Sequence, residues 1–253
     1  MPYARFAAAS AAALLAASPA FAGVVIEGTG EEGEENQRFL MDGQKLRFDT
    51  GSGADAMIFD ASTKQMVHVD AANKTFTEFT KEDAAQVQAM SKGVQKEKSA
   101  RTTRYEKTGK SDKALGKSCD VYRVIESDAE EGEEETICVA PFGTFGISRG
   151  DFAPFLAFGD FASQLSGGGV DRGWADLPGV PLIAWEKDDE GTRETFRATK
   201  VEKRSVPASE FAVPAGFKKG PGFAEQMREM QKAQQEMQQQ LQQQLQQQQG
   251  GKK

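Results

Sequence analysis

The chain has very few histidine and cysteine residues. Its 253 residues include one histidine and two cysteines, whereas a structural zinc site takes about four ligands. The formal net charge of −7 disfavours nucleic acid as a partner, because binding to phosphates needs clustered lysine and arginine. We therefore expect no cofactor, no metal and no nucleic-acid partner, and we predict that the protein is not an enzyme.

A long hydrophobic run is also missing. The apolar residues 6–17 cover about a dozen positions, whereas a membrane-spanning helix needs roughly 20. They follow Arg5 and precede small residues that end at Ala22, as in a cleavable secretory signal. Residue 23 is a glycine and not the cysteine that a lipoprotein would acylate. The pattern predicts a signal peptide over residues 1–22, cleavage after Ala22, and a mature periplasmic protein that does not span the membrane.

The two cysteines are expected to pair with each other. Cys119 and Cys138 both lie in the part that would be exported, where oxidation is the normal fate of a cysteine pair. Residues 117–126 and 135–140 have the pattern of a hairpin, and a register with Cys119 opposite Cys138 would allow the bond. Such a disulfide is worth roughly 3 kcal/mol. Zinc ligation and redox catalysis are the alternatives, but further ligands and a C-x-x-C spacing are missing.

Short apolar runs alternate with turn residues from residue 36 to residue 79, which predicts an antiparallel meander. Leu46 and Phe48 alternate with charged residues, so we expect a sheet with a single core face. A helix is predicted over residues 81–91, with Thr80 as its N-cap. The expected strands of the meander are residues 38–41, 45–49, 56–60, 65–70 and 75–79.

Two later segments extend the expected sheet. Residues 181–187 and 192–201 predict a hairpin whose two-residue turn sets Trp185 opposite Phe196, a favourable aromatic cross-strand pair. Residues 211–217 contain a proline, which cannot donate to a central ladder, and they predict an edge segment that seals the core.

The most apolar segment of the mature chain, residues 152–165, follows helical spacing, with Asp151 as the expected N-cap. A phenylalanine-rich helix that faces a curved sheet has two interpretations: its side chains line an apolar cavity, or they fill the core. The candidate residues of an apolar groove are Phe152, Phe155, Leu156, Phe158, Phe161 and, from the predicted hairpin, Trp185.

Two short motifs are similar to catalytic signatures. Residues 28–33 match G-x-G-x-x-G, but the glutamates within the motif would repel a phosphate and no helix pattern follows. Residues 146–150 match G-x-S-x-G around Ser148. Hydrolases with that motif place their histidine after the serine, whereas the one histidine here, His68, precedes it. We therefore expect neither a nucleotide site nor a catalytic serine.

The chain ends in a segment of different composition. Residues 220–253 are rich in glutamine, which is typical of a low-complexity tail. Methionine and leucine recur there at helical spacings, so a helix that binds an envelope protein and a solvated, disordered tail both remain open. The expected organisation is a signal peptide (1–22), one domain (23–219) and this tail.

Several strand-and-turn segments resemble an exported bacterial domain family without an assigned function. They lie at residues 41–47, 57–60, 66–70, 74–78, 117–122, 179–182 and 211–217. That family is similar in turn to the periplasmic lipoprotein carriers. The resemblance implies an α+β, mainly antiparallel fold: an open, strongly curved sheet, or half-barrel, with helices on its concave face.

The resemblance implies binding and supplies no catalytic residues. Our leading hypothesis is a non-enzymatic binding or carrier domain for a lipid or another apolar envelope molecule. The alternative is a structural or adaptor protein that acts through its glutamine-rich tail.

Overall fold

The computed structural model describes residues 22–30, 36–51, 55–91, 103–127, 134–165 and 176–222, and positions 225, 229, 232, 233 and 237 of the tail. The predicted signal peptide lies outside these residues up to residue 21, as does most of the tail, so both stay predictions. None of the helices in these ranges is long and apolar enough to cross a membrane.

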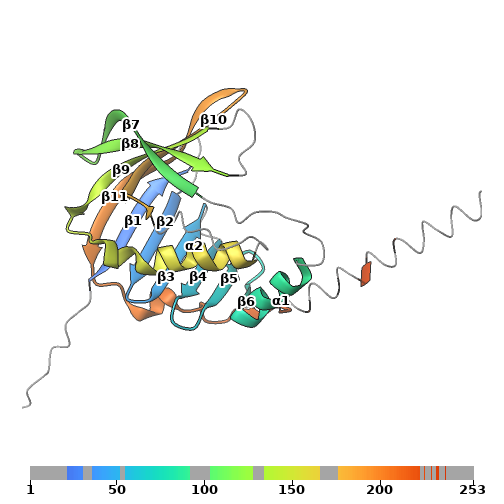
Figure 1. The fold of residues 1–253 in the computed structure, drawn as a ribbon. Coiled ribbons are helices and arrows are strands. Elements are labelled where there is room, and N and C mark those ends of the chain that lie inside the picture. The colour runs from blue at the N-terminus through green and yellow to red at the C-terminus, as the bar shows by residue number, and fades with distance from the viewer. Residues whose placement is uncertain are drawn as a thin grey trace, which may run out of the picture.

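The described strands form one open sheet, which is antiparallel except at one short edge pair (Figure 1). The order across the sheet is β12-β6-β5-β4-β3-β2-β1-β11-β10-β9-β8-β7. The prediction of a mainly antiparallel, open sheet with few helices is confirmed. The bounds are β1 (Gly23–Thr29), β2 (Asn36–Asp42), β3 (Lys45–Thr50), β4 (Asp55–Asp60), β5 (Gln65–Asp70), β6 (Thr75–Phe79), β7 (Thr103–Ala114), β8 (Lys117–Glu126), β9 (Glu134–Phe145), β10 (Gly179–Asp188), β11 (Gly191–Arg204) and β12 (Lys218–Lys219).

Strand β1 connects two groups of strands. Strands β2 to β6 follow one another in chain order, as the meander predicts, and β7 to β11 do the same on the other side. β1 pairs with β2 along one edge and with β11 along the other. The first strand of the domain therefore occupies an interior position, which its run of buried residues Val24–Ile26 suits.

Two helices lie in the described part. Helix α1 (Lys81–Ser91) has the predicted bounds, and the Asp83 N–H donates to the Thr80 hydroxyl, as an N-cap requires. Helix α2 (Ala153–Leu165) follows a 3₁₀ turn, η2 (Arg149–Phe152). It packs against β2, β3 and β4 and against α1 (Figure 1).

The predicted N-cap of the phenylalanine-rich helix is wrong. The cap is Ser148, three residues before Asp151, and the helical turns begin at η2. Both the N–H and the hydroxyl of Ser148 donate to the Asp151 carboxylate, at 2.7 and 2.8 Å. The aspartate therefore has the third position of a capping box, where a carboxylate bonds back to the cap residue.

Two predicted registers also differ from the structure. Val121, and not Cys119, lies opposite Cys138, so the cysteines form a diagonal pair on one face. In the later hairpin, Asp188 pairs with Gly191, and a bulge follows at Ala184 and Trp185. Trp185 therefore lies opposite Glu194, while Ala184 takes the place opposite Phe196. Turn position and bulges set the register, and the residue pattern alone gave no sign of this bulge.

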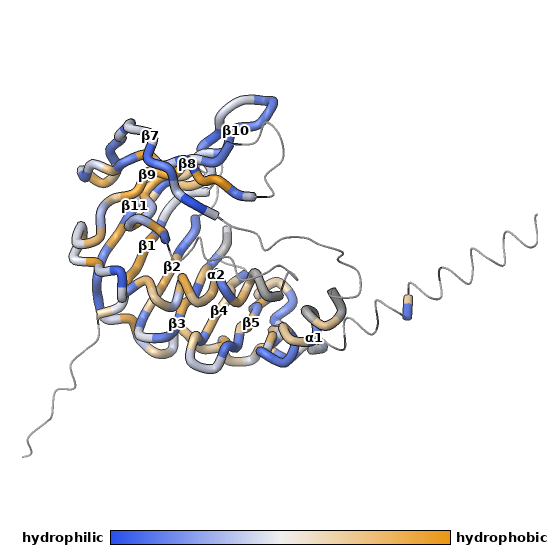
Figure 2. The backbone as a smooth tube through the Cα atoms, in the orientation of Figure 1, coloured by the Kyte–Doolittle hydropathy of each residue, from blue (hydrophilic) through white to orange (hydrophobic). Residues whose placement is uncertain are grey.

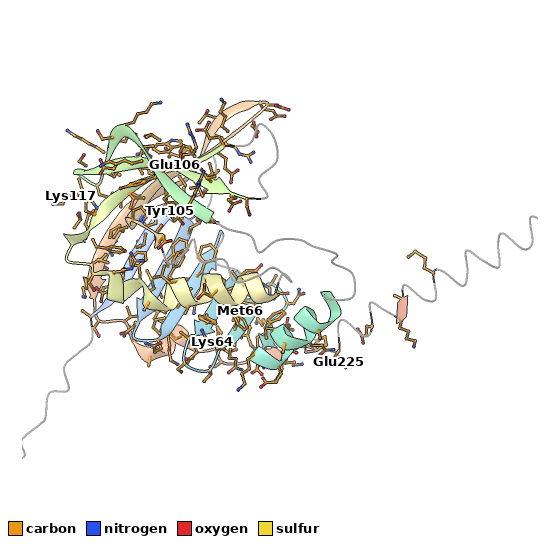
Figure 3. All side chains as sticks on the ribbon, in the orientation of Figure 1. Lys64, Met66, Tyr105, Glu106, Lys117 and Glu225 are labelled. Atoms are coloured by element: carbon orange, nitrogen blue, oxygen red, sulfur yellow. A yellow bond between two sulfur atoms is a disulfide. The ribbon has the colours of Figure 1, made fainter. Side chains whose placement is uncertain are left out.

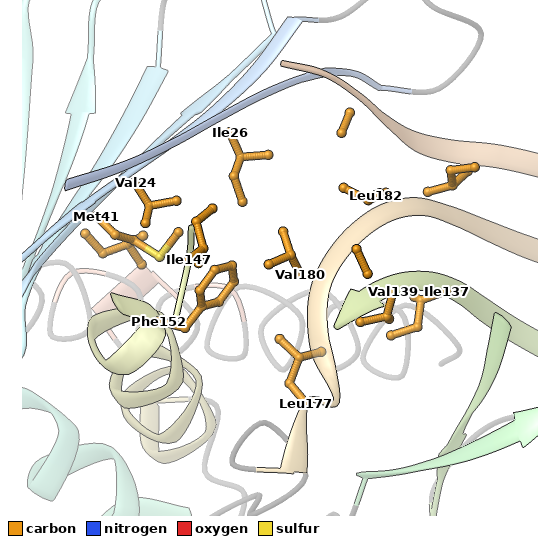
Figure 4. Close-up of a cluster of buried hydrophobic side chains, with 14 of the residues drawn as sticks. Val24, Ile26, Met41, Ile137, Val139, Ile147, Phe152, Leu177, Val180 and Leu182 are labelled. Carbon is orange, nitrogen blue, oxygen red and sulfur yellow. The ribbon is translucent and has the colours of Figure 1, made fainter. Parts of the chain in front are cut away.

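The expectation of a single core face is wrong for the meander. The main core contains Met41, Leu46, Phe59 and the helical Phe161 (Figure 4 shows the part of this core around Phe152). Strands β1, β2, β4 and β5 also contribute buried residues to a second core on the opposite face, which the returning chain covers with Val206 and Phe211. In Figure 2 the strands of the meander accordingly carry hydrophobic colours over much of their length.

An ion-pair network attaches this returning chain to the back of the sheet. Asp49, 8% exposed, accepts from Arg38 at 2.8 Å and from Arg47 at 2.6 Å. The two guanidinium groups also bond Glu210 of η4 (Ala208–Phe211), one through its carboxylate and the other through its carbonyl oxygen. Partly buried charges are stable only when paired in this way, so the network fixes η4 over β2 and β3.

Candidate functional site

A mostly apolar cavity lies between the start of α2 and the strands around it. Its volume is about 230 Å³. Most of its wall consists of apolar side chains, and its polar contributors are few. The lining residues are Ile26, Gln37, Phe39, Met41, Thr103, Tyr105, Val124, Glu126, Glu135, Ile137, Phe152, Phe155, Leu177, Pro181, Ala184 and Phe196.

The positions of these residues show that the sheet curls. Phe39 lies on β2 and Tyr105 (labelled in Figure 3) on β7, and six strand steps separate the two strands in the sheet. In a flat sheet, with neighbouring strands about 4.8 Å apart, they would lie roughly 29 Å from each other. Both line one cavity of modest volume, so the strands from β2 to β7 must bend around it.

Of the six candidate groove residues, two line the cavity and four do not. Phe152 and Phe155 line the cavity. Phe161 is 2% exposed, and its ring packs 5.4 Å from that of Phe59, which also contacts Phe158 at 5.6 Å. Leu156 and Trp185 pack against the main core without lining the cavity. The start of the helix therefore borders the cavity, while its later phenylalanines fill the core.

The disulfide links two of the strands that border this cavity. Cys119 and Cys138 are bonded, with their Cα atoms 5.3 Å apart, and both are buried. The bond ties β8 to β9, and these two strands supply Val124, Glu126, Glu135 and Ile137 to the lining. The predicted disulfide is confirmed, and its position suits a covalent brace for one cavity wall. A disulfide is also consistent with an exported protein.

The polar lining residues come from one end of the strands. Gln37 and Glu135 are the second residues of β2 and β9, while Thr103 begins β7 and Glu126 ends β8. The strand pairings place Thr103, Glu126 and Glu135 at the same end of the sheet: Thr103 pairs with Glu126, and Val124 pairs with both Tyr105 and Glu135. The cavity is therefore apolar beside α2 and polar at this end.

The first glycine of the G-x-G-x-x-G segment has a packing role. Gly28 lies in β1 at a register shift, beneath the ring of Phe196. A Cβ atom on Gly28 would contact that ring and would lie 2.7 Å from the Arg197 carbonyl oxygen. Phe196 lines the cavity, so only glycine lets the ring take this position.

The G-x-S-x-G segment is engaged in capping. Besides Ser148, the Asp151 carboxylate bonds the Lys203 ammonium at 2.9 Å. Partial burial alone would raise the pKa of Asp151, but the hydrogen bonds from Lys203 and Ser148 outweigh it and lower this pKa. His68 lies far along the sheet on β5, opposite Met57 and Thr77. Within the described residues, Ser148 therefore hydrogen-bonds a carboxylate that is itself paired with the Lys203 ammonium.

No metal-binding group of three or more histidine, cysteine or carboxylate side chains gathers in the described ranges. The cavity wall likewise holds only two carboxylates among its described residues. The arrangement suits an apolar ligand with a polar end better than it suits a metal ion.

The comparison with known families identifies the chain. Residues 21–217 match the family described as Domain of unknown function (DUF4412). The match covers more than half of the chain, so the protein belongs to this family. No curated protein matches the sequence.

Sequence reasoning missed most of the cavity wall. Phe39, Val124 and Ile137 belong to strands that the sequence predicts, but nothing in their local sequence shows that they face one cavity. Alternation along each strand could have marked them as inward-facing. The curl that brings β2 near β7 depends on the pairing of the whole sheet, which local patterns do not encode.

Proposed function

We propose that the protein is a non-enzymatic binding or carrier domain of the cell envelope that holds an apolar molecule in the cavity between α2 and the curled strands. The single observation that carries the proposal is a cavity whose described lining is mostly apolar and reaches from β2 to β7. Apolar concave sites with a few placed polar groups are the usual form of small-molecule binding sites.

The volume limits the size of the occupant. About 230 Å³ is below the ~300–1,000 Å³ range of pockets for drug-sized ligands. A single hydrocarbon chain or one small apolar molecule fits this space better than a lipid with several chains does. The proposed cargo is therefore one acyl or alkyl chain, with the rest of its molecule outside.

We also propose that the sheet is a half-barrel with α2 on its concave face, a shape similar to that of the periplasmic lipoprotein carriers. Phe152 and Phe155, at the junction of η2 and α2, support it because they border the cavity from the helical side. Export to the periplasm belongs to the same proposal, since such cargo occurs there.

The experiment begins with the full chain, expressed so that the cell processes it. The purified protein is extracted with organic solvent and the extract is analysed by mass spectrometry, and the stripped protein is then titrated with the neutral fluorescent probe N-phenyl-1-naphthylamine. We expect an apolar molecule in the extract or saturable, single-site probe binding. Absence of both results would overturn the proposal.

A further inference from the structure

A row of partly exposed side chains crosses the meander next to helix α2. Phe39 pairs with Phe48, Phe48 with Met57, and Met57 with His68. His68 in turn pairs with Thr77. All five side chains are partly exposed. These residues, the ladder row, run from β2 to β6 at one level of the sheet.

The ladder row lies on the same face of the sheet as α2, which crosses the strands of the meander (Figure 1). Two residues away along each strand lies a second row, and residues with this spacing point to the same face. The second row belongs to the main core, where Phe158 and Phe161 of α2 contact its Phe59. The helix therefore packs on the second row, and the ladder row stays partly exposed beside it. The second row consists of Met41, Leu46, Phe59, Met66 and Phe79.

The apolar part of the ladder row is continuous with the cavity. Phe39 lines the cavity, and its ring stacks on that of Phe48 with the centroids 4.4 Å apart. Met57 extends this apolar surface onto β4. At His68 and Thr77 hydrogen-bonding side chains replace apolar ones. The apolar surface outside the cavity therefore covers two strand steps, about 10 Å, and then ends.

The small cavity and the ladder row together indicate the shape of the ligand. We infer that the ligand has one unbranched hydrocarbon chain, which leaves the cavity at Phe39, lies over Phe48 and Met57, and ends before His68. Along this path the chain gains free energy, because it removes partly exposed apolar surface from water. The inference rests on the proposed function, since it names the ligand class of the same cavity and the path of the part that lies outside.

Met57 provides a matched pair of variants. It lies outside the described lining of the cavity and is partly exposed, so a change there leaves the cavity wall as it is. Met57→Gln replaces the thioether by a polar amide on a side chain of similar length. Met57→Leu keeps the position apolar, and a swap of this kind is well tolerated. An effect of the apolar path must therefore appear in the glutamine variant and be absent from the leucine variant.

The test measures how two neutral alcohols, hexan-1-ol and dodecan-1-ol, displace N-phenyl-1-naphthylamine from the stripped full-length protein. Both are used below their solubility limits. Each buried methylene group tightens binding about fourfold. The natural protein should therefore bind dodecanol at least about a hundred times more tightly than hexanol, because the ladder row receives the part of the chain that the cavity does not hold.

The variants assign this gain to the ladder row. Met57→Gln should reduce the ratio of the two affinities at least about tenfold, through weaker binding of dodecanol alone, and Met57→Leu should keep the natural ratio. An unchanged ratio in the glutamine variant, or a natural ratio near one, would overturn the inference and leave the proposed function standing. Equal weakening of both alcohols would also overturn it. If neither the probe nor either alcohol binds, the inference fails, and the proposed function fails with it when the extract also holds no apolar molecule.

Discussion

The two halves of the sheet are stabilised in different ways. The meander half, β1–β6, has a hydrophobic core on each face, with α2 over one and the returning chain with Phe211 over the other. The disulfide half, β7–β10, borders on one face the same cavity that β1 and β2 of the meander half also line. On its other face, β7–β9 expose charged side chains such as Lys107 and Arg123.

The difference shows where this fold can accommodate a ligand. A sheet packed on both faces has little freedom to change, because protein cores are close-packed. The disulfide half has packing on one side only, and it borders an unfilled space, so it needs another source of stability. The bond between Cys119 and Cys138 supplies it by constraining the unfolded chain. We therefore expect mutations in the two halves to affect the stability of the protein differently.

Loss of the disulfide should have the largest effect. In the double variant Cys119→Ser, Cys138→Ser, the free energy of unfolding should fall by about 3 kcal/mol, since the bond closes a short loop in the unfolded chain. Urea denaturation measures the loss. Hydrogen exchange should accelerate first at the amides of β8 and β9, while β3 and β4 keep their protection. Equal acceleration in both halves would contradict the distinction between them.

Loss of the buried Asp49 carboxylate in the meander half should have the second-largest effect on stability. Asp49→Ala leaves the guanidinium groups of Arg38 and Arg47 without their shared partner, and we expect a cost of about 2 kcal/mol, because both arginines are only partly buried. The control is Asp120→Ala, which breaks the exposed pair with Lys107 and should cost at most about 1 kcal/mol. Similar costs for the two variants in thermal denaturation would show that the back-face network is not important.

A methyl group at Gly28 should affect both stability and binding. Gly28→Ala forces the Phe196 ring out of its position in the cavity wall, and overpacking of this kind costs about 1–3 kcal/mol. Affinity for the neutral probe should also change. Gly150→Ala is the matched control, because its Cβ atom would lie 3.7 Å from the nearest side chain. A Gly28 variant as stable as the Gly150 variant would contradict the packing role.

The smallest effect concerns pH. The pKa of Asp151 is lower in the folded protein than in the unfolded chain, because Lys203 and Ser148 hold its ionised form despite partial burial. Its contribution to stability is therefore present above the unfolded pKa of about 3.9 and is lost as the pH falls through the lower folded value. Asp151→Asn should cost at most about 1 kcal/mol at neutral pH. The difference should disappear in acid, and a cost independent of pH would exclude this cause.

The sequence predicted local features well and long-range geometry poorly. Thr80 and the bounds of α1 follow from capping chemistry and helical spacing, and the structure confirms them. The pairing of Cys119 with Cys138 followed from the number and setting of the cysteines. The cross-strand partners predicted for Cys138 and Trp185 were wrong, because the turn placement and a bulge shift the register. The shift in the cysteine hairpin is two residues, which keeps every side chain on the same face and therefore leaves the alternation of apolar and polar residues unchanged.

The candidate site was predictable only at its helical side. Phe152 and Phe155 could be recognised because helical spacing places them on one face of an apolar segment. The opposite wall, with Tyr105 and Val124, results from the curl of the sheet. The second core was missed because Phe211 was assigned to an edge, while in fact it packs on the back of the meander.

The most direct test of ligand binding in the cavity is to fill the cavity with a larger side chain. Ala184 lines it from β10, opposite Phe196, so Ala184→Phe places a ring in the space where we propose that an apolar chain binds. Ala153→Phe adds the same bulk at an exposed position at the start of α2. Titration of both stripped variants with N-phenyl-1-naphthylamine should show at least about tenfold weaker binding to the Ala184 variant and unchanged binding to the Ala153 variant. Equal affinity of the two folded variants would contradict the account.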